Sequence, residues 1–383
     1  MDFAVTEEVS LIRQTVRRFV KEELLPLERP CQFKVENLPP ETFEALVKKV
    51  KDIGLYGLGV PVQFGGPGLG QLALTLIEED IRWAMVGTNV FGSNGPAALY
   101  TASDDLKERY LYPTLRGEKR SCFAFTEPIT GADPSSMITN AVRDGDNYVI
   151  NGRKIFITGA HKASYMQLFA RMKGTTGREG ITSFIVDMDA PGVHIDRIIY
   201  TMAHPSAASE FPCEIALTDV VVPASQRVGE EGGAWGIAQG FLGGARFGMG
   251  ANAIARSERC LQMATDYAKQ RVTFGQPIAN RQAVQFMLAD SSIEIESLRW
   301  LTYSSSWKTE QGMDTRSEIS MVKVLASETL WRVADRAIQV HGGVGLTTDL
   351  PLELIFREAR VDRIVDGPNE VHRFVIARNL LRK

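Results

Sequence analysis

The order of hydrophobic periodicities along the chain constrains its fold more than any other feature. Apolar residues recur at helical spacing before residue 121, fall into short strand-like runs as far as Pro223, and return to helical spacing from Gly233 onward. Because strands and helices do not alternate, a parallel Rossmann-type sheet is not expected. The sequence predicts an α+β protein with an all-α N-terminal domain at 1–118, a middle β-barrel-like or sandwich domain at 119–230, and a C-terminal four-helix bundle at 231–383.

The first domain is predicted to contain four helices, at 7–27, 40–53, 71–83 and 104–112. Pro26 is expected to end the first helix, and Gly54 the second. The glycine-rich loop at 64–70 lacks the Lys-Ser/Thr ending of a P-loop, so a tight turn is the simpler interpretation.

Short β-favouring runs define the middle domain: Phe123 with Phe125, then 148–150, 154–157, 166–170, 183–186 and 214–217. Turns are expected at 144–147 and at Asn151-Gly152. Helical patterns then cover 233–270, 279–311, 315–341 and 369–382. The run from Gly248 to Ala253 matches a dinucleotide-binding fingerprint by letter, but no strand precedes it, so it is expected to be helical.

Composition excludes several functional classes. The net charge of -3 gives no reason to expect nucleic-acid or anionic-membrane binding, and no segment is apolar enough to span a bilayer. The cysteines are far apart and the histidines scattered, so neither a disulfide framework nor a metal site is expected. The start of the chain has no basic and apolar secretory pattern. These features favour a reducing compartment, either the cytoplasm or, for a mature eukaryotic protein, the mitochondrial matrix.

A carboxylate at a rigid corner is the strongest catalytic candidate. Ile364-Val365 leads into Asp366, Gly367-Pro368 breaks the backbone, and Asn369 is expected to cap a new helix. An apolar environment would raise the pKa of Asp366 and make it a useful base. On this stretch alone, an ordinary helix–helix turn is the simpler interpretation.

Motifs elsewhere reverse that preference. Five segments, in the expected order over nearly the whole chain, resemble the acyl-CoA dehydrogenase family: Thr126–Asp133, Phe156–Gly159, Arg271–Ile278, Gln339–Gly345 and Phe356–Arg360. Each segment is weak alone, and together they are specific. The resemblance implies an FAD-dependent homotetramer, built as a dimer of dimers, that oxidises acyl-CoA thioesters to 2-enoyl-CoA. It also implies that electron-transfer flavoprotein is the electron acceptor.

The resemblance assigns Asp366 as the base that removes the α-proton, with its own N–H as one donor to the thioester oxygen. Asp replaces the family's usual Glu and is shorter by one methylene, about 1.5 Å. A family subgroup with Asp in this position is therefore suspected. The alternative base position of the isovaleryl-CoA type falls on Ala245, which cannot act as a base. Arg246 and Gly367 are expected to bind substrate.

The resemblance also implies the cofactor contacts. Residues expected near the flavin are Phe123, Phe125, Thr126, Phe156 and Thr158. Residues expected at the pyrophosphate and adenosine of a neighbouring subunit's FAD are Arg271, Thr273, Phe274, Gln282, Gln339, Gly342 and Gly343. Ala132, Pro368 and Glu370 replace the usual Ser, Thr and Gln at further cofactor positions. Taken singly, Phe125 and Phe156 also fit a β-domain core, and Arg271 a solvated surface charge.

Several other functions remain open at this stage. A nitroalkane oxidase-like enzyme also uses an Asp base, and an acyl-CoA oxidase differs in its reaction with oxygen. A nucleic-acid-binding flavoprotein relative would need a basic face, which the net charge disfavours. A catalytically inactive relative is disfavoured by the conservative Asp. His204 could contact a polar acyl group, although a loop histidine is the simpler interpretation.

Overall fold

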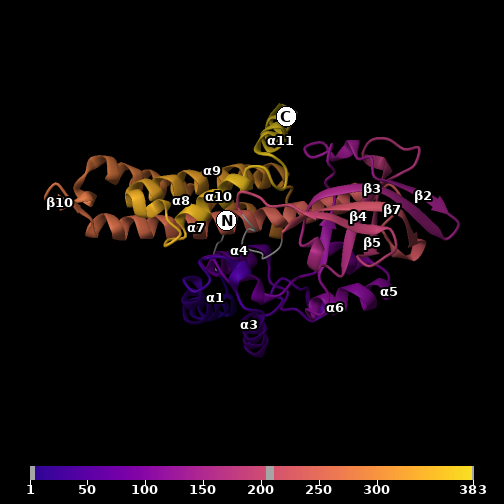
Figure 1. Ribbon diagram of the computed structural model, residues 1–383, viewed down its shortest axis with the longest axis horizontal. Helices are drawn as coiled ribbons and strands as arrows, with labels where there is room; N and C mark the ends of the chain where they lie inside the picture. Colours follow the sequence, from indigo (N-terminus) through magenta and orange to yellow (C-terminus); the bar gives the residue numbers. More distant parts are fainter. Residues whose placement is uncertain (1–4, 204–210, 382–383) are drawn as a thin grey trace. The chain divides into compact units, whose positions relative to one another are not determined.

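The computed structural model describes residues 5–203 and 211–381, without the side chains of 241 and 242. The chain forms two compact units (Figure 1). Unit 1 contains Met1–Pro61, Pro67–Phe91 and Gly243–Lys383, and unit 2 contains Val62–Gly66 and Gly92–Leu242. The predicted order of helical, β and helical segments is confirmed.

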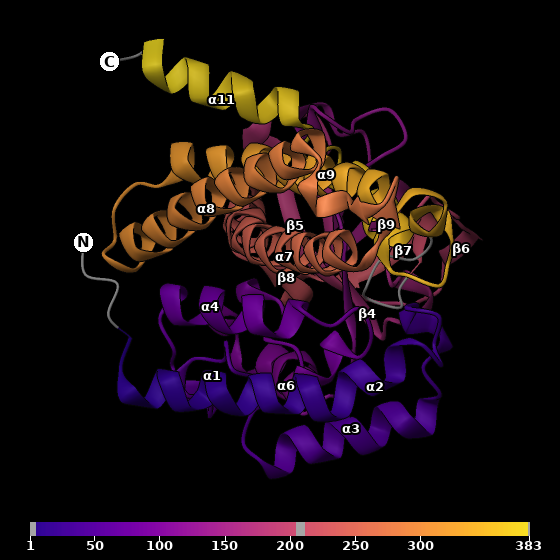
Figure 2. The same ribbon diagram turned by 90° about the vertical axis from the view of Figure 1, so that its left-hand side faces the viewer.

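Unit 1 is helical and layered. Its first segments supply α1 (Glu7–Phe19), α2 (Leu25–Glu28), α3 (Pro40–Asp52) and α4 (Gln71–Arg82), and its last segment supplies most of α7 (Ala234–Gln270), α8 (Gln282–Glu310), α9 (Arg316–His341), α10 (Leu352–Asp362) and α11 (Asn369–Leu381). α1 packs on α4, α4 packs on α8, and α9 contacts α8, α10 and α11 (Figure 2). The four predicted C-terminal helices are present. The fingerprint-like glycines lie inside α7, as expected, and α10 is an additional helix.

The first helix does not end at Pro26, contrary to the prediction. A π-helical turn at Val20–Leu24 follows α1, and Pro26 is the second residue of α2. The same arrangement recurs in unit 2, where a π-turn at Lys107–Leu111 precedes Pro113 at the second position of α6 (Tyr112–Leu115). A π-turn shifts the hydrogen-bond register, so each proline falls where a first turn needs no N–H donor.

Unit 2 is built on an eight-stranded sheet flanked by the short α5 (Asp104–Leu106) and α6. The strands are β1 (Ser121–Ala124), β2 (Asn140–Asp144), β3 (Asn147–Thr158), β4 (Tyr165–Met172), β5 (Ile181–Asp187), β6 (Val193–Ile198), β7 (Pro212–Pro223) and β8 (Arg227–Val228). Their order is β6-β7-β3-β2-β4-β5-β8, and β1 pairs in parallel with β4. Tyr148, Phe184 and Ile215 are buried in its core.

The turn predicted at Asn151-Gly152 is wrong. β3 runs through both residues, and its pairing with β7 shifts register between Ile150 and Gly152. A Cβ on Gly152 would lie 2.7 Å from the Cα of Thr139, so the glycine permits a close approach between backbones. The predicted turn at 144–147 is confirmed, because it joins β2 to β3 as a hairpin.

Candidate functional site

Asp366 lies in the corner between α10 and α11, as predicted. Its backbone is left-handed, with φ of 54°, and Gly367 follows with φ of 95°. A left-handed non-glycine residue carries strain that the surrounding structure must hold in place. The prediction that Asn369 caps α11 is wrong. Its side chain is buried, accepts from Lys323 Nζ at 2.8 Å and donates to Ser327 Oγ at 3.0 Å, so it ties the corner to α9.

The main-chain carbonyl of Asp366 is held by two side chains. Arg246 Nη2 donates to this oxygen at 3.1 Å, and His372 Nε2 lies 3.1 Å from it. Among the described residues, the Asp366 carboxylate accepts no hydrogen bond or ion pair, and the Asp366 N–H has no acceptor. In the described part of the chain, the corner therefore restrains the Asp366 carbonyl and leaves the carboxylate and N–H of Asp366 available to a ligand.

The environment of Asp366 favours a basic carboxylate. Burial raises the pKa of Asp366, while the positive charges of Arg246 and Lys323 oppose that rise. Burial also lowers the pKa of Lys323 to about 8. Asp362, one helical turn earlier, has a pKa raised to about 7 by burial and by the charge of Glu358. Such clustered, perturbed groups are typical of functional sites.

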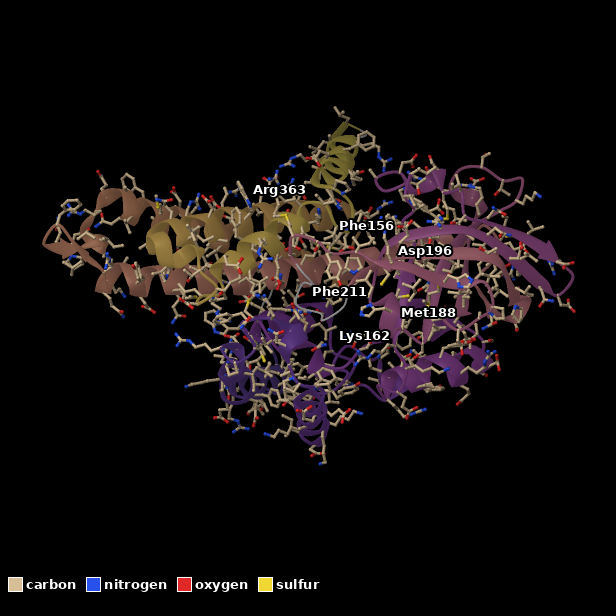
Figure 3. All side chains as sticks on the ribbon, in the orientation of Figure 1. Phe156, Lys162, Met188, Asp196, Phe211 and Arg363 are labelled. Carbon is tan, nitrogen blue, oxygen red and sulfur yellow. The ribbon has the colours of Figure 1, made fainter. Side chains whose placement is uncertain are left out.

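The predicted flavin-contact residues of unit 2 gather on two neighbouring segments. Ile155 N donates to Thr126 O at 3.0 Å, which places the segment after β1 beside the end of β3. Phe156 projects from β3 with 57% of its surface exposed and φ of 57° (Figure 3), and Thr158 is also exposed. Phe125 is buried beside Phe169, with ring centroids 5.0 Å apart. Phe123 contacts the same ring, and Ala132 is exposed in the loop after β1.

A buried ion pair holds this segment, and the sequence analysis missed it. Lys154 Nζ lies 2.9 Å from Glu127 Oε1, and both side chains are fully buried. The Glu127 carboxylate also accepts from the N–H of Ile138 at 2.7 Å and of Thr139 at 2.9 Å. Burial opposes ionisation of Glu127, but Lys154 and these bonds hold its pKa below the usual value. Glu127 lies in the family-like segment Thr126–Asp133, which could have identified it. No sequence motif indicated a role for Lys154.

The predicted adenosine and pyrophosphate residues lie at one end of the unit 1 helices. Arg271 starts a hairpin of β9 (Val272–Thr273) and β10 (Gln276–Pro277), whose tip residues Phe274 and Gly275 have φ of 50° and 77°. The Phe274 side chain is 96% exposed. Tyr267 of α7 stacks on His341 of α9 at 4.6 Å, so the ends of these helices meet. Other predicted residues exposed in these end segments are Gln282, Gln339, Gly342 and Gly343.

Left-handed backbone marks several predicted site residues. Within residues 5–203 and 211–381, six non-glycine residues have positive φ, and three of them are Phe156, Phe274 and Asp366.

The remaining predicted cofactor positions lie next to Asn369. Pro368 is part-buried and Glu370 exposed, on either side of Asn369. His204 lies outside the described residues.

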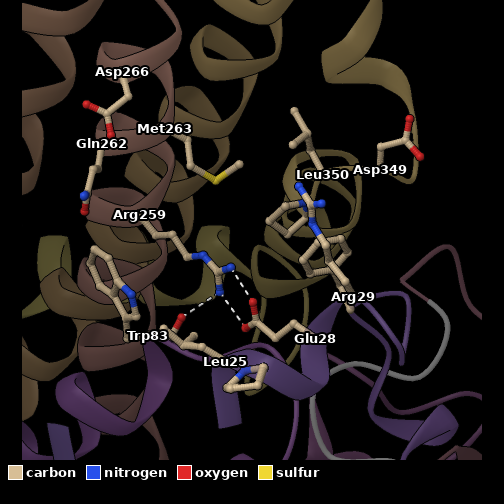
Figure 4. A pocket seen from close by; sticks show the side chains of 13 residues that line it. Leu25, Glu28, Arg29, Trp83, Arg259, Gln262, Met263, Asp266, Asp349 and Leu350 are labelled. Atoms are coloured by element: carbon tan, nitrogen blue, oxygen red, sulfur yellow. Dashed lines mark hydrogen bonds and ion pairs between the residues drawn. The ribbon is translucent and has the colours of Figure 1, made fainter. Parts of the chain in front are cut away.

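A cavity of about 460 Å³ in unit 1 lies away from all predicted site residues. Arg259 crosses it and donates to Glu28 at 2.7 and 2.5 Å, and to Trp83 O at 2.9 Å (Figure 4). Glu28 also accepts from the Met85 N–H at 2.7 Å. These bonds give the polar lining a structural role. The described part of the chain contains no cluster of potential metal ligands, and none of its helices is long and apolar enough to cross a membrane.

Three family models cover most of the chain in the order of the fold. The N-terminal, middle and C-terminal domains of acyl-CoA dehydrogenase match residues 6–118, 122–220 and 232–381. The chain belongs to the acyl-CoA dehydrogenase family. This acyl-CoA dehydrogenase is 36% identical to (R)-benzylsuccinyl-CoA dehydrogenase of Thauera aromatica, over all of this chain and 97% of the relative.

Solved structures agree. Butyryl-CoA dehydrogenase from Megasphaera elsdenii superposes over the full length of both chains with a TM-score of 0.87 and 30% identity. A chain from a structure described as the electron transferring flavoprotein of Acidaminococcus fermentans also matches over both full lengths, with a TM-score of 0.88 and 31% identity. The protein is an FAD-dependent oxidoreductase that dehydrogenates acyl-CoA thioesters to enoyl-CoA products.

The residues present fit the flavin cofactor. Phe156 offers an exposed aromatic face held in a strained conformation, with the hydroxyl-bearing Thr126 and Thr158 on the same two segments. The exposed Phe274 hairpin adds a second surface with Arg271 at its base. An almost fully exposed phenylalanine with positive φ is costly unless a ligand or partner covers it.

Proposed function

We propose that Asp366 is the base that removes the α-proton of the acyl-CoA substrate. One observation carries the proposal: the Asp366 carbonyl has two donors, whereas its carboxylate and N–H have no hydrogen-bond or ion-pair partner within residues 5–203 and 211–381. Because its pKa is raised by burial, the carboxylate is a stronger base than an exposed Asp. The assignment also supports membership of the subgroup with Asp in place of Glu.

The α-proton of a thioester is weakly acidic, so the developing negative charge on its oxygen needs a donor. The N–H of Asp366 is suited to this role, because none of the described residues accepts from it and it belongs to the same residue as the proposed base. Arg246 and Gly367 border the substrate position from α7 and from the corner. Bound FAD supplies the acceptor for the β-hydride.

In unit 2, the residues proposed to contact the flavin are Phe123, Phe125, Thr126, Phe156 and Thr158. In unit 1, the residues proposed to contact the pyrophosphate and adenosine of a neighbouring subunit's FAD are Arg271, Thr273, Phe274, Gln282, Gln339, Gly342 and Gly343. Ala132, Pro368 and Glu370 are proposed as further cofactor positions. Arginine suits that phosphate contact, since its guanidinium donates to two oxygens at once.

Asp366→Asn tests the base. The variant should bind FAD and acyl-CoA, but anaerobic flavin reduction should slow by at least about 10²–10⁴-fold. Asp314→Asn, which alters an exposed carboxylate of unit 1, is the matched control. Unchanged single-turnover reduction in Asp366→Asn would remove this residue from the mechanism. A panel of acyl-CoAs, with nitroethane as a comparison, would identify the acyl group and separate a nitroalkane oxidase.

We further propose a homotetramer, a dimer of dimers. The large apolar residues Phe286, Ile293 and Trp300 recur every seventh position of α8 with 59%, 64% and 53% of their surfaces exposed. A heptad-spaced apolar stripe is suited to packing against another helix. In this assembly, the Phe274 hairpin would reach the FAD of a neighbouring subunit.

Electron-transfer flavoprotein is the proposed electron acceptor, in the cytoplasm or in the mitochondrial matrix of a eukaryote. The match to a chain from the Acidaminococcus structure supports this pairing. The proposed domains are 1–118, 119–230 and 231–383. No role in nucleic-acid or membrane binding is proposed. Reduction of purified electron-transfer flavoprotein by the acyl-CoA-reduced enzyme, compared with reduction of oxygen, tests the acceptor.

A further inference from the structure

His372 connects the catalytic corner to α9. Its side chain is 2% exposed and lies in the first turn of α11. Nδ1 is 3.2 Å from Ser320 Oγ, and Nε2 is 3.1 Å from the carbonyl oxygen of Asp366. Ser320 is itself buried, and its Oγ also lies 3.0 Å from Arg316 O, so its single hydroxyl proton can be donated either to Arg316 O or to His372 Nδ1. The imidazole therefore bridges a helix and the corner from both of its nitrogens.

The partners of His372 restrict its protonation. A carbonyl oxygen only accepts, so Nε2 must carry a proton to bond Asp366. Burial and the positive charges of Arg246 and Lys323 lower the pKa of His372 to about 4, although the bond to Asp366 opposes this shift. The ring is consequently neutral near pH 7. Nδ1 is left as an acceptor for the Ser320 hydroxyl proton, which is then donated to Nδ1 and not to Arg316 O.

We propose that His372 is a positioning residue whose neutral Nε2–H tautomer, supported by Ser320, fixes the Asp366 carbonyl and thereby aims the Asp366 carboxylate at the α-proton of the thioester. This inference rests on the proposed role of Asp366 as the base. Rotation about the Cα–C bond of Asp366, whose φ is 54°, would turn its carbonyl relative to its Cβ, so a fixed carbonyl restrains the backbone torsion that orients the side chain. Two donors, from α7 and α11, hold the carbonyl in place.

Gly367 permits the contact between His372 and the Asp366 carbonyl because it has no side chain. A Cβ at this position would lie 3.1 Å from His372 Nε2, and the φ of 95° is one that side-chain-bearing residues rarely adopt. The glycine lets the imidazole approach the corner closely enough to bond the carbonyl.

Proton removal can be measured separately from hydride transfer. An acyl-CoA analogue with sulfur in place of the β-carbon has an acidic α-proton but no β-hydrogen to lose. Its α-hydrogen exchange in D₂O, followed by mass spectrometry, reports the base alone. We expect His372→Ala to slow exchange about 10–100-fold while analogue binding changes little, because small misplacements of reacting groups have effects of this size. His372→Gln, whose amide can donate from a similar position, should restore exchange to within a few-fold of wild type.

Wild-type exchange in His372→Ala, or equal losses in the Ala and Gln variants, would overturn the positioning role. If Asp366→Asn abolishes exchange while His372→Ala exchanges at the wild-type rate, only the role of His372 fails. If Asp366→Asn exchanges normally, the base assignment fails.

The ¹⁵N spectrum of wild-type holoenzyme labelled at its five histidines is a second measurement, independent of turnover. The His372 signals, identified by their loss in His372→Gln, should show a protonated Nε2 and an unprotonated Nδ1 at pH 7.5. An Nδ1–H tautomer or an imidazolium would contradict the proposal.

Discussion

The buried pair of Glu127 and Lys154 gives a quantitative test of how the flavin-contact segment is held. Glu127→Gln removes the counter-ion of a fully buried ammonium, and leaves one amide oxygen where two carboxylate oxygens accepted from Ile138 and Thr139. Breaking a buried pair from one side typically costs about 3–5 kcal/mol, because the remaining charge is uncompensated. Lys154→Met should be destabilising for the reciprocal reason.

Local opening is the appropriate readout, since a chain with two compact units need not unfold in one step. At about 1.4 kcal/mol per tenfold change, the expected loss lowers hydrogen-exchange protection of the Ile138 and Thr139 amides by roughly two to nearly four orders of magnitude. FAD retention should fall in parallel, because the same segment carries Thr126.

The double variant Glu127→Gln/Lys154→Met removes both charges and should recover most of the lost protection. Glu118→Gln, in an exposed pair with Arg116 at 2.7 Å, is the matched control and should change little. Additive effects of the two buried substitutions, or unchanged protection in Glu127→Gln, would refute the idea that this pair fastens the segment.

Three further predictions concern pH, cofactor and assembly. The pKa of Asp362 is raised to about 7, so its neutral form stabilises the fold fully below the unfolded-state pKa of about 3.9, and this stabilisation is lost as pH rises through 7. Asp362→Asn should therefore raise Tm more at pH 8 than at pH 5. Equal gains in Tm at the two pH values would contradict the raised pKa. Arg271→Ala should weaken FAD retention and oligomer stability together, measured by flavin release and sedimentation; unaltered FAD affinity would reject its cross-subunit role. Ile293→Glu should dissociate the oligomer in sedimentation at fixed concentration, and an intact tetramer would exclude the α8 stripe.

Periodicity predicted the long helices and most strands, because those segments bury a regular face. The prediction failed where a proline or glycine that usually ends a helix or strand was accommodated by the local backbone geometry. Pro26 lies inside a helical run because a π-turn precedes it. Asn151-Gly152 remains in β3, where the pairing with β7 shifts register and the missing side chain of Gly152 permits a close approach to Thr139. Neither the π-turn nor the irregular strand pairing can be recognised from the spacing of apolar residues.

The corner was predictable, but its support was not. The break at Gly367-Pro368 indicated where Asp366 would lie, whereas the bonds from Arg246 and His372 join residues 120 and 6 positions away in the sequence. Asn369 was predicted as a cap because Asn suits that position, yet a better partner was available: the buried Lys323 ammonium needs an acceptor, and the amide oxygen of Asn369 supplies it.

The proposed role of Asp366 as a short base accounts for a corner whose carbonyl is held by two donors. A glutamate has an additional side-chain torsion with which to correct a small error in its backbone, whereas the aspartate carboxylate follows the backbone more directly. The position of an aspartate carboxylate therefore depends mainly on the main chain, where Arg246 and His372 contact the carbonyl oxygen of Asp366. The Asp366 N–H, the proposed donor to the thioester oxygen, lies in the preceding peptide plane, so the two bonds to the carbonyl restrain it only through the backbone torsions of Asp366.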